Sequence, residues 1–443
     1  MNEAALIAEI DGYLERLFPI TRSLTGEGNR QTFRILQEIV PLKITEYPSG
    51  TPVYDWVVPD EWIIRDAFIK APDGDRLIDF SKCNLHVVGY SIPVNQQMTF
   101  DELAPRLHVL TGNPNAIPYR TNYYNRDWGF CVTGAQYDLL KNAKGLLEVC
   151  IDSDFNPKGS MTVGELWIPG QSEEEYLIST YCCHPSMAND NLSGVLTAAF
   201  LARHLLAGSA PRNNWRFVFV PETIGAIAYL YHNEMAMKKI QGGLIAATCG
   251  GPGGLGYKET YIGNHTVDRA IELAFRDRGI EPLRYTFVPD GSDERQYSSP
   301  GFRIPVATIT RDKYYEYAQY HTSMDNMDFV NGSQIVDSIG LYRDVVRILD
   351  NNVRYRSMAP YGEPQLSRRG LYPVIGGAVN QSGISDNDRQ THRALDAISW
   401  LLFLADGEHD LLTTVERSGL SFVDFLQPVE QLIECGLLEP VSG

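Results

Sequence analysis

The chain has 443 residues, of which 44% are apolar and 21% are charged, and its formal net charge is −17. This length exceeds one compact core, so we expect two or three domains. The acidic balance argues against binding to nucleic acids or anionic membranes, and no apolar run approaches the roughly 18 residues of a membrane span.

The first segment predicts an amphipathic helix, followed by a second helix and a strand that ends near Pro48. Leu6, Ile10 and Leu14 recur at helical spacing, and Pro19 ends the pattern. The segment is acidic and lacks a basic start, so we do not expect a signal peptide. Seven cysteines without CxxC spacing indicate reduced thiols. We therefore expect a cytoplasmic protein.

Residues 54–140 predict an inserted β-rich domain. Short β-like segments are separated there by proline, glycine and aspartate turn signals. Three of these segments are YDWVVP at 54–59, WIIRDAFIKAP at 62–72 and NLHVVGYSIP at 84–93.

Residues 141–360 alternate short apolar runs with helical patterns, which predicts an α/β sheet flanked by helices. We expect them to form one discontinuous domain with residues 1–53. Short apolar runs are typical of buried parallel strands. The runs are 176–180, 215–220, 244–247 and 306–309, and the helical patterns cover 192–206, 266–278 and 334–349. After a linker, three further helices are expected in a separate domain, 361–443.

Histidine and acidic side chains follow the predicted strands. His184 and Asp190 lie where the run 176–180 gives way to a helix, Glu222 follows the run 215–220, and His321 stands in the polar segment YHTSMDN. Ligands of open α/β sheets bind at the carboxyl ends of strands, and imidazole and carboxylate are ligands of zinc. The pattern predicts a metallohydrolase. The alternatives are a turn-capping role for His184 and a carboxylate stabilised by a helix dipole for Glu222.

The segment HPSMANDNLSG (184–194) resembles the metal-binding loop of the co-catalytic zinc aminopeptidases, the group that also contains glutaminyl cyclases. That resemblance implies that His184 and Asp190 bind zinc, that the peptide bond after Asp190 is cis, and that His321 is the late histidine ligand.

The whole chain more closely resembles bacterial aminopeptidase-like domain proteins, some of which occur among polysaccharide-biosynthesis genes. The matching segments include PITRSLTGEGNR, VPDEWIIRDA, NLHVVGYSIP, WGFC, PETIG and GSDERQY. The resemblance implies a zinc-aminopeptidase-like mixed sheet flanked by helices, an inserted small β-domain and a C-terminal winged-helix-like domain.

Two departures from the aminopeptidase pattern limit the expected metal content. The usual pair of adjacent glutamates is here Glu222-Thr223, and a further acidic ligand is replaced in the segment Ala247-Thr248-Cys249. One ligand is thus missing from each zinc of a two-zinc site. We therefore expect one zinc ion per chain, held by His184, Asp190 and His321. Cys249 as a thiolate ligand is the alternative to a buried structural thiol.

The expected function is a mononuclear zinc hydrolase that cleaves an amide or peptide bond of a small substrate, with Glu222 as general base. Glu222 could instead become a fourth ligand, which would leave the protein weak or inert. In that alternative the chain is a module that binds a small molecule or a protein. Polysaccharide or secondary-metabolite biosynthesis would be the setting for such a module.

Four polar residues are candidates for substrate binding. Asp293, Glu294 and Arg295 belong to the polar segment GSDERQYSSPGF, where an acidic group would suit a substrate ammonium and the arginine a carboxylate. Arg22 in TRSLTGEG is the fourth. A solvated loop is the alternative for the first three, and turn formation for Arg22.

The C-terminal domain is not expected to bind DNA, although a winged helix is often associated with it. Residues 374–443 contain three arginines, no lysine and eleven acidic residues, whereas DNA binding relies on cations that neutralise phosphates. Contact with another protein, or assembly into a homo-oligomer, is expected instead.

Overall fold

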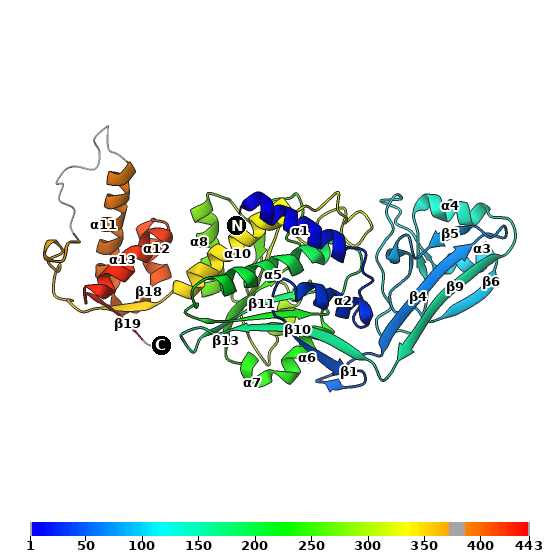
Figure 1. The fold of residues 1–443 in the computed structure, drawn as a ribbon, viewed down its shortest axis with the longest axis horizontal. Coiled ribbons are helices and arrows are strands. Elements are labelled where there is room, and N and C mark those ends of the chain that lie inside the picture. The colour runs from blue at the N-terminus through cyan, green and yellow to red at the C-terminus, as the bar shows by residue number, and fades with distance from the viewer. Residues whose placement is uncertain (1, 372–385, 442–443) are drawn as a thin grey trace. The chain divides into compact units, whose positions relative to one another are not determined.

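The computed structural model describes residues 2–371 and 386–441. The chain separates into two compact units, of which the first comprises Met1–His265 with Pro282–Tyr342 and the second comprises Thr266–Glu281 with Arg343–Gly443. Figure 1 shows the course of the chain. No helix within the described ranges is both long and apolar enough to cross a membrane. The predicted linker after Tyr361 falls largely on residues 372–385, outside those ranges.

An eight-stranded mixed sheet forms the centre of the first unit, and four neighbouring strands in its middle run parallel. These four strands are the predicted apolar runs, and burial on both faces explains their composition. The strand order is β1 (Lys43–Pro48), β10 (Ser160–Ile168), β12 (Asn214–Val220), β11 (Glu175–Tyr181), β13 (Ile240–Ala246), β16 (Val306–Thr310), β14 (Gly256–Lys258) and β15 (Leu283–Tyr285).

Helices cover both faces of this sheet. α5 (Gly194–Ala207) contacts β11, β12 and β13, whereas α6 (Ile224–His232) contacts β10 and β12. Figure 1 shows these two helices on opposite faces. α5 carries apolar residues on nearly all sides. Its outer side is also buried because α1 covers it, and there Tyr13 packs edge-on against Phe200. The remaining helices of this unit are α1 (Glu3–Leu17), α2 (Glu27–Leu36), α3 (Phe100–Leu103), α4 (Gly134–Asn142), α7 (Glu234–Met237) and α9 (Glu294–Tyr297), while α10 (Gly332–Asn351) contributes to both units.

The inserted segment forms a four-stranded antiparallel sheet of its own, in the order β5-β4-β9-β6. Its last strand in sequence ends at Asn156, so the β-rich insertion extends past the expected limit at residue 140. The segment 84–93 is not a strand but begins as a single 3₁₀ turn. The strands are β4 (Glu61–Lys70), β5 (Arg76–Asp79), β6 (Val94–Met98) and β9 (Leu147–Asn156), with the short pairs β2 (Pro52–Val53) and β3 (Trp56–Val57), and β7 (Leu107–His108) and β8 (Phe130–Cys131).

The second unit is of the winged-helix type. Strand β17 pairs with both other strands of a three-stranded antiparallel sheet and begins at Arg354, so this domain starts before the expected boundary at residue 361. α8 belongs to the same unit, where Arg269 forms an ion pair of 2.6 Å with Glu416 of α12. The elements are α8 (Thr266–Arg278), β17 (Arg354–Ser357), α11 (Asp386–Leu404), β18 (Asp406–Asp410), α12 (Leu411–Ser418), α13 (Val423–Glu434) and β19 (Leu438–Pro440).

A buried ion pair joins the inserted sheet to the central sheet. Arg30 of α2 donates two hydrogen bonds, of 2.8 and 2.7 Å, to the carboxylate of Glu61 at the start of β4. The backbone N–H of Ser160 in β10 donates a third, of 3.0 Å, to the same carboxylate. The hydrogen bonds from Arg30 outweigh the effect of burial and lower the pKa of Glu61 below 4.5. The ionised carboxylate therefore contributes to stability at neutral pH.

We expect Glu61→Gln to lower the free energy of unfolding by about 1–3 kcal/mol at pH 7, because Arg30 then loses its closest counter-charge and keeps only the more exposed carboxylates of Glu46 and Glu27. The folded pKa lies below the unfolded one, so this contribution is present above pH 4.5 and is lost as the pH falls through the folded pKa. Urea unfolding at pH 7 and at pH 3.5 measures it. The exposed pair Arg16–Glu38 supplies the control, Glu38→Gln, which should change little. An equal loss at both pH values would contradict this account.

Candidate metal centre

The loop between β11 and α5 carries the first two predicted metal ligands. His184 and Asp190 lie just past the carboxyl end of β11, and both side chains are buried. The side-chain amide of Asn191 fixes this loop to the sheet, because it donates to the carbonyl oxygens of Tyr181 (3.1 Å) and Ala246 (3.1 Å). The Asp190–Asn191 peptide bond is cis, as the resemblance implied.

The structure brings His184, Asp190 and His321 together. Nε2 of His321 lies 3.0 Å from Oδ2 of Asp190, and Nδ1 of His184 lies 3.9 Å from Oδ1 of Asp190. One ligand atom from each of the three residues falls within 4.8 Å of the others. Three side chains from two distant loops thus surround one point at the edge of the sheet.

Two buried polar atoms of this cluster have no hydrogen-bond partner among the described residues. They are Nδ1 of His184 and Oδ2 of Asp190, the latter despite the nearby ring of His321. Buried polar atoms are almost always paired, so these two indicate a missing partner that accepts electron pairs. A divalent cation meets that requirement, and a set of nitrogen and oxygen ligands suits zinc.

The protonation of the cluster also fits a metal ion. Burial lowers the pKa of His184 to about 4. Burial alone would raise the pKa of Asp190, but the neighbouring His184 and His321 lower it to about 2. At neutral pH the His184 ring is therefore neutral and the carboxylate ionised, which are the states in which these groups bind metals.

Two supporting residues escaped prediction from the sequence. The hydroxyl of Tyr181 donates a 2.6 Å hydrogen bond to Oδ1 of Asp190. Asp325 accepts the backbone N–H groups of Asn189 (2.6 Å) and Asp190 (2.9 Å), so it holds the first loop against the loop of His321. The segment YHTSMDN contains Asp325, but only the fold shows which backbone it meets.

The inserted segment forms part of the wall of this site. The backbone N–H of Tyr119 donates to the carbonyl oxygen of His321 at 2.8 Å. The ring of Tyr119 packs edge-on against His184 and His321, at centroid distances of 5.1 and 5.2 Å. The insertion therefore contacts two of the three predicted ligand side chains.

Glu222 faces the same cluster from the turn between β12 and α6. Its Oε2 lies 3.7 Å from Nε2 of His184. Burial, followed by the charges of Asp293 and Asp190, raises its pKa well above 4.5. Thr223, its neighbour, adopts a left-handed backbone conformation (φ 64°) that turns the chain into α6. The carboxylate of Glu222 therefore lies next to the ring of His184.

The cluster opens into a cavity of about 140 Å³. Its walls are mainly aromatic and polar side chains. They are Tyr123, Tyr181, His184, Asp190, Glu222, Thr223, Gly291, Ser292, Arg295, Tyr314, Tyr315, Tyr320 and His321. A small substrate can therefore reach Glu222 and the metal-ligand side chains together.

Only Arg295 of the four predicted substrate-binding residues lines this cavity. Glu294 is buried and forms a 2.5 Å ion pair with Lys258. Asp293 is buried and accepts the backbone N–H of Thr223 at 2.7 Å. Arg22 lies behind His184, whose carbonyl oxygen accepts a hydrogen bond from it. The last three residues are therefore buried, bonded to other parts of the fold and outside the lining of this cavity.

Cys249 is not part of the cluster. Its thiol is buried against the carbonyl oxygens of Ala247 (3.5 Å) and Ile309 (3.8 Å), and burial raises its pKa to about 12. Among the described residues, a second candidate group contains Cys183 with His184 and Glu222, but burial raises the pKa of the Cys183 thiol well above 9.0. A neutral thiol is a poor zinc ligand.

Comparison with known proteins identifies relatives over the full length. Residues 12–352 match the family described as "Domain of unknown function (DUF4910)", and residues 353–440 match a winged helix-turn-helix family. A protein of Clostridium acetobutylicum, provisionally named as a polysaccharide biosynthesis protein with an aminopeptidase-like domain, is 42% identical over 99% of this chain and 98% of its own.

Solved structures give the same result for the fold. The crystal structure of a provisionally assigned peptidase from Clostridium acetobutylicum has a TM-score of 0.89 and 40% identity, covering 99% of this chain and 98% of that one. BSAP, a zinc aminopeptidase from Bacillus subtilis, has a TM-score of 0.57 at 13% identity, covering 78% of this chain and 95% of its own. The aminopeptidase-like fold is therefore established.

We expect Asp325→Asn to weaken zinc binding roughly 10- to 100-fold, because residues that orient metal ligands typically have effects of this size. The amide retains one acceptor oxygen, but its NH₂ group cannot accept the second backbone N–H of the first loop. Zinc titration against a competing chelator measures the change. Asp328→Asn, at an exposed position of the same loop, is the control. Equal affinities for the two variants would show that Asp325 does not orient the ligands.

Proposed function

This chain belongs to the family described as "Domain of unknown function (DUF4910)", and we propose that it is a mononuclear zinc-dependent hydrolase. Its aminopeptidase-like fold brings together three side chains that could hold a metal ion. The bond cleaved is an amide or peptide bond of a small substrate. The observation that carries this proposal is the His184–Asp190–His321 cluster with its two unpaired buried atoms, open to a cavity that Glu222 also lines.

Three protein ligands and one open position are typical of catalytic rather than structural zinc. His184, Asp190 and His321 would hold the ion. When bound, zinc lowers the pKa of a coordinated water from 15.7 to about 7 and polarises a carbonyl group. A hydrolytic role is therefore favoured over a structural one.

Glu222 is the proposed general base. Its carboxylate would accept a proton from the attacking water and donate it to the leaving amine. No other carboxylate lines the cavity apart from that of Asp190, within the described part of the chain. Asp190 is hydrogen-bonded to Tyr181 and belongs to the ligand cluster, which leaves Glu222 for proton transfer.

Arg295 is the proposed binding group for an acidic part of the substrate. It lines the cavity beside Thr223, to whose hydroxyl it donates a hydrogen bond of 3.3 Å. Its closest carboxylate, that of the exposed residue Asp290, is 3.7 Å away and solvated. The guanidinium can therefore pair with a substrate carboxylate in the bidentate manner that arginine favours.

A weakly active or inert binding protein is the second candidate. Thr223 replaces the second glutamate of the aminopeptidase pattern, and Thr248 pairs with the hydroxyl of Thr310 where a further acidic ligand is usual. The relative from Clostridium acetobutylicum carries a polysaccharide-biosynthesis name, so a sugar-linked amide is one substrate class to include in a screen.

The C-terminal unit is proposed to contact protein rather than DNA. Its acidic composition lacks the cations that DNA binding requires. Phe403, Val423 and Ile433 are exposed apolar residues of this unit. They are consistent with a protein contact, including a homo-oligomer.

We expect Glu222→Gln to reduce hydrolysis by roughly 10²- to 10⁴-fold, because the amide cannot accept the proton. The variant should still bind zinc with unchanged stoichiometry. Turnover of a panel of aminoacyl amides, dipeptides and N-acyl sugars, together with elemental analysis, provides the measurement. Loss of zinc along with activity would instead make Glu222 a metal ligand.

We expect one zinc ion per chain in the wild-type protein and none in His321→Ala, because two remaining ligands leave the site open on one side. Elemental analysis after dialysis measures both. His232→Ala is the matched control, since its ring stacks on Tyr47, away from the cluster. Two ions per wild-type chain would mean that Cys183 or another residue completes a second site. No zinc after loading would overturn the proposed hydrolase.

A further inference from the structure

Arg22 is a buried cation with an unused donor. It belongs to the loop between α1 and α2, and only 1% of it is exposed. Its Nε donates to the carbonyl oxygen of His184 at 2.9 Å, and its Nη1 donates to that of Leu17 at 2.6 Å. Its Nη2 is buried and has no hydrogen-bond partner. The guanidinium of Arg22 therefore donates to two neutral carbonyl oxygens, and its Nη2 is left to bind a third group.

No carboxylate of the described residues pairs with this guanidinium. Its hydrogen bonds run only to backbone carbonyl oxygens. Arginine keeps its proton in proteins, and an isolated buried charge is strongly unfavourable unless it is paired. The fold therefore contains a positive charge that lacks its counter-charge.

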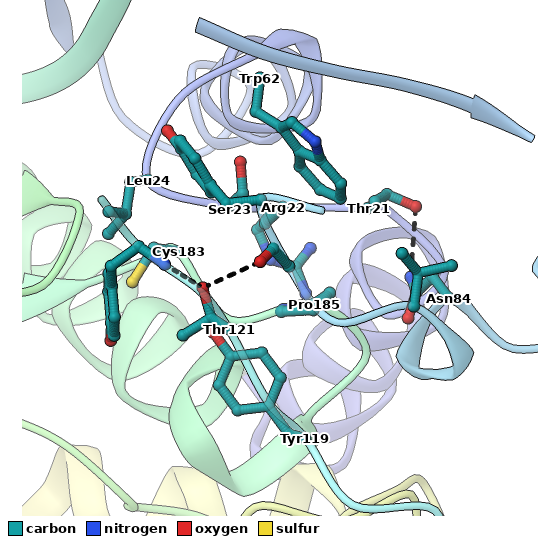
Figure 2. Close-up of a pocket in the computed structure, with 14 residues that line it drawn as sticks. Thr21, Arg22, Ser23, Leu24, Trp62, Asn84, Tyr119, Thr121, Cys183 and Pro185 are labelled. Atoms are coloured by element: carbon teal, nitrogen blue, oxygen red, sulfur yellow. Dashed lines mark hydrogen bonds between the residues drawn. The ribbon is translucent and has the colours of Figure 1, made fainter. Parts of the chain in front are cut away.

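A small cavity adjoins this residue. Figure 2 shows Arg22 among the side chains that line it, with Thr121, Cys183 and Pro185 close by. Its volume is about 20 Å³, which is room for one species the size of a water molecule. A carboxylate or a phosphate is too large. A monatomic anion is the only common counter-charge that fits.

The other polar groups of the cavity do not supply that charge. The hydroxyl of Thr121 donates to the carbonyl oxygen of Gly89 at 3.4 Å, and that of Ser23 donates to Thr25 at 2.5 Å. The remaining walls include Leu24, Trp62 and Asn84, whose Oδ1 is a buried acceptor without a hydrogen-bond partner among the described residues. Arg22 is the one residue of the lining that carries a charged side chain.

We propose that this cavity binds a single halide ion, chloride in the cell, through Nη2 of Arg22. The ion neutralises the buried guanidinium, which a water molecule does not do. Because Nε of the same guanidinium holds the carbonyl oxygen of His184, the ion fixes the backbone of the metal-binding loop from behind. Arg22 is thus a positioning residue, and the proposal does not depend on hydrolytic activity.

The direct test is crystallographic. Crystals of the full chain grown in sodium bromide are measured at the bromine absorption edge. We expect an anomalous peak in the cavity within hydrogen-bonding distance of Nη2 of Arg22. Electron density without an anomalous signal at that position would identify a water molecule and overturn the proposal.

A solution test uses the same protein without crystals. Thermal unfolding is followed in sodium chloride and in sodium gluconate at equal ionic strength, with and without zinc. A ligand that binds only the folded state raises the midpoint as its concentration increases, so we expect a chloride-specific rise of about 2 °C or more. Identical midpoints in the two salts would overturn the proposal.

Variants separate the proposed ion from general salt effects. Arg22→Gln should abolish the chloride-specific rise, whereas Arg16→Gln, which changes an exposed arginine, should retain it. A chloride-specific rise that survives in Arg22→Gln would assign the effect to another site and overturn the proposal. If Arg22→Gln does not fold, the bromide measurement on the wild-type protein decides.

Discussion

The carboxylate of Asp325 is the contact on which the candidate metal centre depends. It accepts the backbone N–H groups of two consecutive residues, Asn189 and Asp190, and so ties the loop after β11 to the loop that carries His321. Side chains from these two loops meet only if their backbones are held at this distance. A buried carboxylate that accepts backbone N–H groups is a rigid link, because an unpaired N–H in this environment would be costly.

The same requirement explains the place of the inserted segment in the fold. The backbone N–H of Ser323 donates to the carbonyl oxygen of Ile117, and the backbone N–H of Ile117 donates to the hydroxyl of Ser323. The backbone N–H of Tyr119 donates to the carbonyl oxygen of His321. The loop of His321 is therefore held on one side by Asp325 and on the other by the insertion. Arg30 and Glu61 then connect the sheet of the insertion to the central sheet. The β-rich insertion is in this sense part of the site and not a separate module.

The parts of this structure that could be predicted from the sequence are those determined by local pattern. The four parallel strands were predicted because burial on both faces produces continuous apolar runs, and His184 and Asp190 were predicted because they follow one of those runs. β9 was missed although its residues alternate between buried and exposed, which is the pattern of a half-buried strand. The sequence does not show that β9 pairs with β4, about 85 residues earlier, in a different sheet from the strand that follows it.

Which of the polar residues at 293–295 line the cavity could not be predicted for a different reason. Glu294 and Arg295 are adjacent and equally polar, yet one pairs with the buried Lys258 and the other lines the cavity. The partner of Glu294 stands on β14, far away in sequence, and its burial is a property of the tertiary fold. Asp325 and Tyr181 are similar cases, since their importance comes from the atoms they meet and not from their neighbours in the chain.

The separation of the metal-ligand side chains along the chain affects how the protein is made. During synthesis, His184 and Asp190 leave the ribosome while β13, β16 and the loop of His321 have still to be added. The nascent chain therefore presents an incomplete set of ligands, with the insertion already available but the last histidine absent. Contacts between such distant segments form slowly because a long loop must close first. A metal ion held by all three side chains, as proposed, would be retained only after the central sheet has closed, so its loading would follow the folding of this unit.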